Sequence, residues 1–299
     1  MNVDLEVTPA VALAVAVFAT STSAILVRWG AAPSSVAAFY RVLFTTALVA
    51  PLAGIRHRAA FARLSRRDLA GAIVAGVALA VHFAAWFESL EHTSVAASVT
   101  LVQSQPIFVA LGAGLLLGER ISRETVLGIV VAIAGAAAMS LGGGRAALSG
   151  ATTYGNALAL LGAVTVAAYV LAGRSIRQRV SLLPYVTVVY GACAVSLFVL
   201  VHVQGHSYVG YPAREWLLFL GLAIGPGVFG HTVSNWVLEH LESVVVSVAW
   251  LGEPVGATLL ALVLLAEVPD AITVVGGVVV IAGVFVTTLE RERGHGTAD

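Results

Sequence analysis

Polar side chains are rare inside the long apolar runs of this 299-residue sequence, and several of them gather beside two prolines. Gln105 precedes Pro106, while Trp250 and Glu253 precede Pro254. In a helix, proline removes one N–H donor and leaves a carbonyl without its usual partner. Inside a membrane such a carbonyl is tolerated only where protein, water or a bound solute satisfies it. We therefore expect both prolines to be helix hinges or walls of a polar cavity; a packing kink without solute contact is the alternative.

A second group of polar residues predicts the remaining walls of that cavity. His82 and Trp86 are four residues apart, and so are His231 and Asn235, so each pair shares one helix face. Buried polar groups in a membrane face the bundle interior, because lipid offers them no partner. Hydrogen-bonded cavity histidines are the expected reading, with pH-sensitive groups or weak metal ligands as the alternative. The predicted cavity residues are His82, Trp86, Gln103, Tyr169, His231, Asn235, Trp236, Trp250 and Glu253.

Two charged residues lie deep within apolar runs, and each needs a partner of opposite charge. Arg41 could form a structural ion pair with Glu88 or Glu91, or its guanidinium could clamp the carboxylate of an anionic or zwitterionic substrate. Glu253 could hold a substrate amine or relay a proton; a neutral carboxylic acid bonded to a neighbouring helix is the alternative.

The other candidates are structural. Glu119 and Glu267 stand near the ends of apolar runs, where we expect them to cap the next helix or stabilise the repeated fold. Cys193 is the only cysteine, and the histidines lack metal-ligand spacing, so we predict no metal site and no cofactor. Neither a His-Glu-x-x-His nor a Gly-x-Ser-x-Gly motif is present. An intramembrane enzyme or a receptor-like scaffold is therefore the least favoured class.

Composition determines where these residues lie. Hydrophobic residues make up 59% of the chain and charged residues 11%, with a mean hydropathy of +0.95, which is too apolar for a soluble globule. The formal net charge of zero gives no indication of a nucleic-acid partner. A membrane-spanning helix needs about 20 apolar residues. By that measure we expect ten spans, at 10–29, 34–55, 69–90, 94–118, 123–142, 154–174, 183–203, 215–237, 243–265 and 271–289.

The sequence contains an internal repeat. Pro106–Leu141 aligns with Pro254–Leu289 at a constant offset of 148, and fifteen of the 36 positions are identical. Five spans are expected in each half, residues 1–148 and 149–299. Because five is an odd number, the second half enters the membrane in the opposite sense. Inverted repeats of this kind are typical of carriers that open a central site alternately to either side.

The arginines predict the orientation, since basic loops stay on the cytoplasmic side of a membrane. With the N-terminus inside, twelve arginines fall in cytoplasmic gaps, whereas only Arg28, Arg145 and Arg214 fall on the opposite side. Both termini are therefore predicted to be cytoplasmic. The twelve are Arg56, Arg58, Arg63, Arg66, Arg67, Arg120, Arg123, Arg174, Arg177, Arg179, Arg291 and Arg293.

The paired motifs resemble those of the drug/metabolite transporter superfamily, EamA type. The resemblance covers nearly the whole chain and rests on Pro106…Gly118-Glu119…Gly128…Gly135, its counterpart Glu253-Pro254…Ala266-Glu267…Gly276…Gly283, and Ala38-Phe39-Tyr40-Arg41. Two departures occur: Ala266 replaces the usual glycine, and Gln105 stands where an acid would precede the first proline.

The resemblance implies an all-α integral membrane protein with ten helices in two inverted repeats around a central cavity. It also implies a multi-pass secondary transporter of the bacterial inner membrane that exports small metabolites by alternating access. The subgroup it resembles most exports aromatic amino acids, so the expected substrate is an aromatic or hydrophobic amino acid; another metabolite, a nucleobase or a drug-like cation is the alternative. The expected partners are this solute and the lipid bilayer, with no nucleic acid and no obligatory protein partner.

Overall fold

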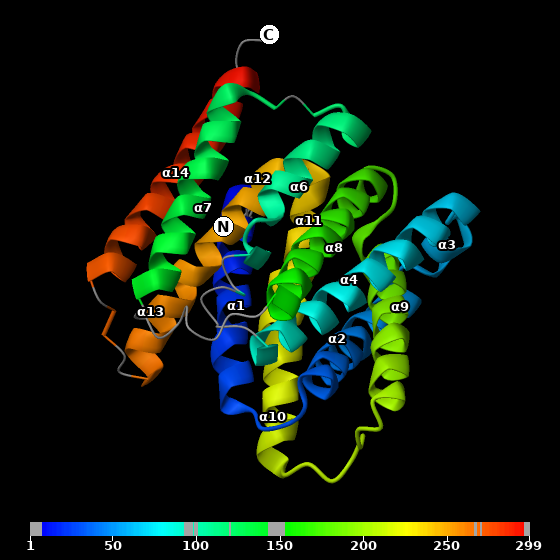
Figure 1. Ribbon diagram of the computed structural model, residues 1–299. Helices are drawn as coiled ribbons and strands as arrows, with labels where there is room; N and C mark the ends of the chain where they lie inside the picture. The colour runs from blue at the N-terminus through cyan, green and yellow to red at the C-terminus, as the bar shows by residue number, and fades with distance from the viewer. Residues whose placement is uncertain are drawn as a thin grey trace, which may run out of the picture.

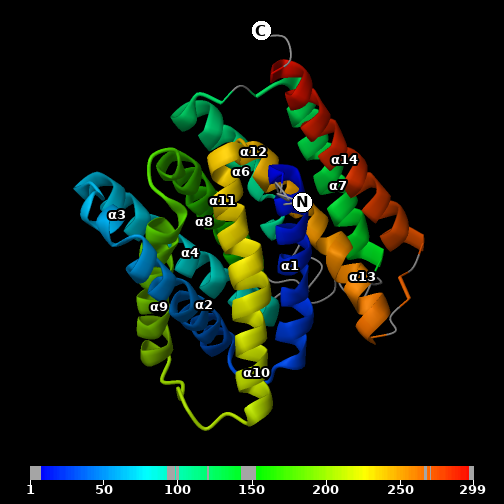
Figure 2. The same cartoon turned by 180° about the vertical axis from the view of Figure 1, so that it is seen from behind.

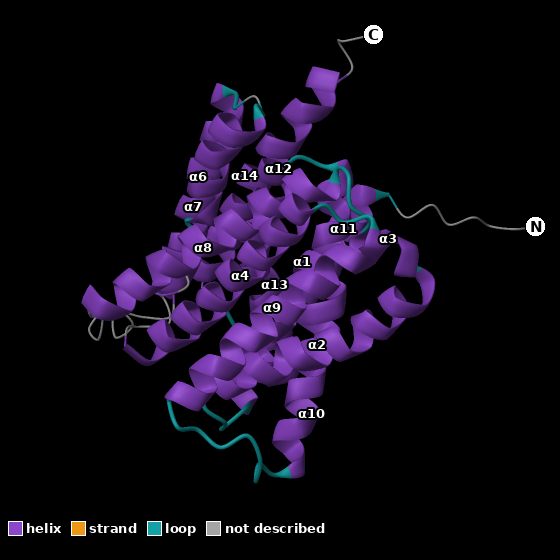
Figure 3. Ribbon diagram, turned by 90° about the vertical axis from the view of Figure 1, so that its right-hand side faces the viewer, coloured by secondary structure: helices purple, strands orange, loops and turns teal. Residues whose placement is uncertain are grey.

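The computed structural model describes residues 8–92, 98, 101–119, 121–142, 153–265, 268–269 and 271–295. Throughout these ranges the chain is built from helices and connecting turns, and none of them contains a strand (Figure 3). The predicted all-helical fold is confirmed.

The described helices agree with the predicted spans, except that residues 94–97 and 99–100 of the span 94–118 lie outside the described residues. In the first half they are α1 (Pro9–Trp29), α2 (Ser34–Arg56), the short α3 (Arg58–Ala62), α4 (Arg66–His92), α6 (Gln105–Gly112), the π-helix η1 (Ala113–Leu117) and α7 (Arg123–Gly142). In the second half they are α8 (Thr153–Arg177), α9 (Leu182–Val203), α10 (Ala213–Leu222), the π-helix η3 (Ala223–Thr232), α11 (Val233–His240), α12 (Ser243–Ala249), the 3₁₀ turn η4 (Trp250–Gly252), α13 (Glu253–Leu265) and α14 (Ala271–His295).

Several of these segments are suited to a bilayer. Among the described residues, seven are long and apolar enough to cross one. Large aliphatic side chains cover the outside of the bundle; Leu115 and Val263, for example, are 83% and 78% exposed. Apolar surface of this extent is stable against lipid rather than water. The protein is therefore a multi-pass membrane protein.

The α7–α14 contact shows that the two halves are related by symmetry. These helices lie side by side in both views (Figures 1 and 2). A Cβ atom added at Gly135 would lie 2.7 Å from the carbonyl oxygen of Gly276, and one added at Gly283 would lie 2.7 Å from that of Gly128. Gly128 and Gly135 are the repeat counterparts of Gly276 and Gly283. The crossing is thus antiparallel and maps onto itself when the halves are exchanged.

Other helix contacts also recur when the two halves are interchanged. The packing of α4 against α8 corresponds to that of η3 against α1, and the packing of α6 against α8 corresponds to that of α13 against α1. α2 packs on its own counterpart, α9. Because each contact recurs with the halves interchanged, the fold consists of two inverted five-helix repeats around a shared interior.

Both prolines lie at helix interruptions. In the first half, a turn at Gln103 and Ser104 precedes α6, whose first residues include Pro106. In the second half, η4 precedes α13, whose second residue is Pro254. Proline is accepted at the first positions of a helix, where its missing N–H would have no intrahelical partner. The predicted breaks are therefore present, although the second is a single tight turn rather than a gap.

Glu119 connects the two halves at one end of the bundle. Its buried carboxylate accepts hydrogen bonds from the backbone N (3.1 Å) and Oγ (2.9 Å) of Ser243 and lies 3.4 Å from Nε of Arg174. We expected Glu119 to cap the next helix, α7, or to stabilise the repeated fold. Ser122 caps α7 by accepting from the backbone N of Thr125 (3.0 Å). Glu119 instead caps α12 in the other half. Glu267 lies outside the described residues.

Candidate functional site

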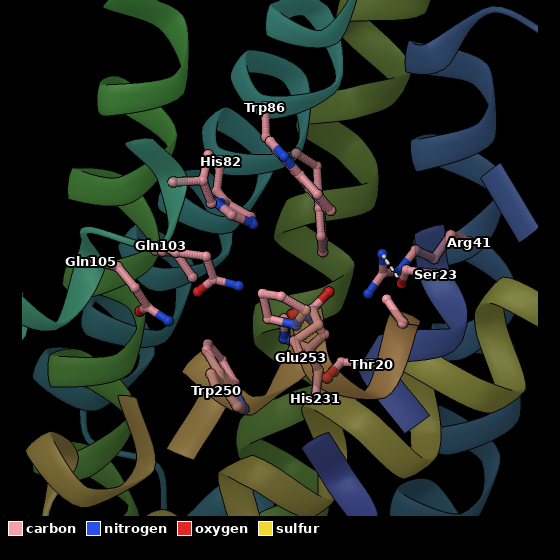
Figure 4. A pocket seen from close by; sticks show the side chains of 15 residues that line it. Thr20, Ser23, Arg41, His82, Trp86, Gln103, Gln105, His231, Trp250 and Glu253 are labelled. Atoms are coloured by element: carbon pink, nitrogen blue, oxygen red, sulfur yellow. Dashed lines mark hydrogen bonds between the residues drawn. The ribbon is translucent and has the colours of Figure 1, made fainter. Parts of the chain in front are cut away.

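A cavity of about 110 Å³ lies between the halves, where the two interrupted helices meet α1, α2, α4, α8 and η3 (Figure 4). A water molecule needs roughly 10–15 Å³ measured in this way, so the space would hold several. Its walls are mixed in character, with hydroxyl, amide, imidazole, indole and charged groups among aliphatic side chains. They are formed by Thr20, Ser23, Arg41, His82, Phe83, Trp86, Val102, Gln103, Gln105, Val166, His231, Trp250, Glu253, Pro254 and Ala257.

Arg41 provides the positive charge of the cavity. It lies within α2 and is only 2% exposed. Its Nη1 donates to Oγ of Ser23 on α1 at 3.4 Å, and its guanidinium carbon lies 4.5 Å from the centre of the Phe83 ring. A buried guanidinium is stable only where a negative charge compensates it. Neither contact supplies one.

Glu253 provides the negative charge from the opposite repeat, at the first residue of α13. Its carbonyl oxygen accepts a hydrogen bond from Oγ of Ser21 at 3.0 Å, which joins α13 to α1. The carboxylate interacts electrostatically with Arg41, but no ion pair within 4.0 Å joins these two described residues. A solute with one charge of each sign could therefore bind both.

The first-half wall contains polar groups with no partner. Neither side-chain amide of Gln103 and Gln105 makes a hydrogen bond within the described part of the chain, and Oε1 of Gln105 is buried. Nε1 of Trp86 is also buried and unbonded among the described residues. His82 is bonded, since its Nδ1 lies 2.9 Å from the carbonyl oxygen of Gly162. This wall can offer hydrogen bonds to a solute.

The second-half wall is more fully bonded. Nε1 of Trp250 donates to Oγ of Ser234 at 3.2 Å, so its indole is held in place by α11. The His231 ring meets Trp250 edge-on, with ring centroids 5.4 Å apart. Nδ1 of His231 is the exception, because it is buried and has no partner in the described chain.

Some predicted site residues do not line this cavity. Tyr169 and Asn235 are buried behind His231, where Asn235 Nδ2 donates to the Tyr169 hydroxyl and to the His231 carbonyl oxygen. Trp236 lies on the other side of its helix and packs its ring against His240, with centroids 4.4 Å apart. A residue that shares a helix face with a cavity residue therefore does not always line the cavity, because neighbouring helices can cover the next turn.

The predicted Arg41–Glu88 ion pair is not formed. Glu88 instead lies 3.0 Å from Nε2 of His92, one turn along α4 and near the bundle surface. The side chain of Glu91 lies outside the described residues. Pro106 does not line the cavity, whereas Pro254 does.

Other lining residues were missed by sequence reasoning. Thr20 and Ser23 come from α1, which we did not include among the polar helices, although Thr20-Ser21-Thr22-Ser23 is an unusual hydroxyl run within an apolar span. That run was an available signal. The sequence gives no such signal for the apolar lining residues, because in a membrane helix they are indistinguishable from packing residues. These are Phe83, Val102, Val166 and Ala257. No group of three or more His, Cys, Asp or Glu side chains that could hold a metal ion occurs in the described ranges.

Comparison with known proteins decides the class of protein to which this cavity belongs. The profile of the EamA-like transporter family matches residues 8–141 and again residues 153–289. The chain belongs to the EamA-like transporter family. The two matches coincide with the two structural repeats, and they identify the protein as a membrane transporter rather than an enzyme.

Proteins named as exporters are among the relatives of this chain. The pseudopaline exporter CntI of Pseudomonas aeruginosa is 28% identical over 80% of this chain and 82% of its own length. A probable terminal-alkyne amino-acid exporter of Streptantibioticus cattleyicolor is 30% identical over 68% of each chain. One solved crystal structure superimposes with a TM-score of 0.80 at 22% identity, covering 95% of this chain and 98% of the other, which supports the fold alone.

Proposed function

We propose that this EamA transporter exports amino acids, or metabolites with an amino-acid head group, from the bacterial cytoplasm across the inner membrane. The observation that carries the proposal is the pair of opposite charges, Arg41 and Glu253, facing one buried cavity without forming an ion pair. An α-amino acid carries a carboxylate and an ammonium group on one carbon. Its carboxylate would bind the Arg41 guanidinium, and its ammonium would bind the Glu253 carboxylate.

The alternatives fit these charges less well. A drug-like cation would find Glu253 but would face repulsion from Arg41 in a medium of low dielectric constant. A simple anion would bind Arg41 but would be repelled by Glu253. A nucleobase would leave both charges uncompensated and out of water. A zwitterion compensates both.

The aromatic rings favour a substrate whose side chain has an apolar or aromatic part. Trp86 and Trp250 approach the cavity from opposite repeats, and Phe83 lies beside Arg41 (Figure 4). Indole rings stabilise apolar and aromatic groups through large contact areas and offset stacking. The relatives named as exporters of pseudopaline and of a terminal-alkyne amino acid support a related substrate here.

The repeats support alternating access, and the arginines support the orientation of the protein in the membrane. The two halves, residues 1–148 and 149–299, would exchange conformations and so expose the cavity alternately to each side. The arginine-rich gaps would face the cytoplasm together with both termini. The interruptions before Pro106 and Pro254 would bend during this exchange.

Counterflow into liposomes tests the proposal. Purified protein is reconstituted into vesicles loaded with an unlabelled amino acid, and uptake of the labelled form is followed for Trp, Phe, Thr and Met. We expect accumulation above that of empty vesicles, and its loss in Arg41→Gln, because the carboxylate loses its bidentate partner. Folded protein that shows no counterflow with any amino acid, but does with a cation or a nucleobase, would contradict the proposal.

A further inference from the structure

We propose that the exported amino acid carries a neutral hydrogen-bonding group on its side chain, and that Gln103, Gln105 and Trp86 recognise that group. The inference rests on the proposed function, because it assumes that Arg41 and Glu253 bind the amino-acid head. It concerns the opposite wall of the same cavity. That wall would distinguish a hydroxyl, amide or ring N–H from a hydrocarbon of the same shape.

The three side chains offer both donors and acceptors that make no hydrogen bond within the described part of the chain. Gln103 and Gln105 are 7% and 3% exposed, and their amides make no hydrogen bond to any described residue. Among the residues that the structure describes, the buried Trp86 N–H has no acceptor and the buried Gln105 Oε1 has no donor. An unpaired polar group is costly to bury, so buried polar groups nearly always have a partner. Two of them, together with the unbonded amide of Gln103, border one cavity, which points to a bound ligand as their partner.

The two walls are arranged to divide the recognition. Figure 4 shows Gln103 and Gln105 across the cavity from Arg41 and Ser23, with Trp86 above the space between them. A head group bound at Arg41 therefore directs its side chain toward the two amides. The charged wall recognises what all α-amino acids share. The amide wall contacts the part in which they differ.

The chemistry of the amide wall requires a neutral group. Carboxamides and an indole N–H carry no net charge, and both charged groups of the cavity face the head of the substrate. A charged side chain at the amides would be removed from water without a compensating charge, which is far more costly than burying a neutral polar group. Acidic and basic amino acids are therefore excluded, and purely aliphatic ones leave the amides unpaired.

The repeat explains how this division is encoded. Gln105 and Glu253 occupy equivalent positions at the offset of 148, each directly before its proline. The backbone interruption presents one side chain from each half to the same cavity. With an acid in one copy and its neutral amide in the other, the symmetric backbone forms an asymmetric site.

Pairs of amino acids that differ by a hydroxyl test the inference. Threonine and valine have nearly the same shape, and tyrosine differs from phenylalanine by one hydroxyl group. In competition against counterflow of labelled threonine, we expect the hydroxyl member of each pair to bind about tenfold more tightly, since a site built to hydrogen-bond a group rejects the analogue without it. Equal competition by both members would overturn the inference but leave the proposed function standing.

Variants of the wall sharpen the test. Gln103→Leu and Gln105→Leu should each reduce the threonine-to-valine preference to about threefold or less, because one partner of the hydroxyl is removed. Gln204→Leu is the matched control, since this glutamine is exposed at the end of α9, and its preference should equal that of the wild type. The preference is a ratio and is independent of the amount of folded protein. An unchanged ratio in both wall variants would overturn the inference; no counterflow by any amino acid would overturn the proposed function with it.

Discussion

The two interrupted helices have the same backbone plan and opposite chemistry. Gln105 and Pro106 begin α6, while Glu253 and Pro254 begin α13, and the residue before each proline lines the same cavity. The first copy presents a neutral amide without a hydrogen-bond partner among the described residues, and the second presents a carboxylate. The repeat therefore preserves the position of the break but not the group displayed there. We propose that a solute with two different end groups binds in one orientation because of this difference.

The two cavity tryptophans show the same contrast. Trp250 in the second half donates its N–H to Ser234, whereas the Trp86 N–H has no acceptor in the described chain. The second-half wall is consequently held in place by its own hydrogen bonds. The first-half wall keeps its hydrogen-bonding capacity for a ligand. Internal symmetry thus governs helix packing, while the site depends on where the copies diverge.

The largest effect is expected when the two positions before the prolines are made alike. Glu253→Gln should weaken amino-acid binding by roughly 100-fold, because the substrate ammonium loses a buried charged partner. The concentration dependence of counterflow measures this change. Glu88→Gln is the matched control and should bind normally, since Glu88 pairs with His92 outside the cavity and partly exposed pairs contribute little. Wild-type affinity in Glu253→Gln would show that the halves do not divide the head group as proposed.

Symmetric packing can be broken at the α7–α14 crossing. Gly135→Ala and Gly283→Ala should each lower the free energy of unfolding by about 1–3 kcal/mol, because each new Cβ meets backbone atoms that must move. Thermal unfolding in detergent measures the loss. Gly191→Ala is the control, since its Cβ meets nothing within 4 Å and alanine favours the helix. Unequal losses at the two positions would mean that the crossing is less symmetric than its distances indicate.

The contrast between the tryptophans predicts a smaller difference. Trp250→Phe should be less stable than Trp86→Phe by about 1 kcal/mol, because only the former loses an internal hydrogen bond. Both changes remove a similar volume, so each variant is the control for the other. Urea or thermal unfolding provides the comparison. Equal stability would argue against the bond between Trp250 and Ser234.

The prolines give the smallest expected effect. Pro106→Ala and Pro254→Ala should slow counterflow on the order of threefold, or about 0.7 kcal/mol in activation free energy, by making the helices harder to bend. Pro51→Ala, an exposed proline within α2, should leave the rate unchanged. Rates equal to wild type in both hinge variants would indicate that neither helix bends at its proline during transport.

Sequence reasoning predicted the fold better than the site. The ten apolar runs agree with the helices because a span in lipid must satisfy its own backbone, which leaves little choice of structure. His82, Trp86 and Gln103 were placed in the cavity correctly, since polar groups in such spans face inward. Tyr169 and Trp236 do not line the cavity, because the position of a residue on a helix face does not determine which neighbouring helix covers it. The π-helix η3 around Pro226 was also not predicted.

The sequence by itself determined the apolar spans, the repeat and the rare polar groups inside it, because hydrophobic length and the cost of buried polarity are local properties of a chain in lipid. Only the tertiary structure decided which of those groups meet. Arg41 faces Glu253 across a cavity rather than pairing with Glu88, and Glu119 caps a helix of the other half rather than its own. Partners far apart in sequence depend on how helices cross, and crossings are set by close contacts such as those of Gly135 and Gly283.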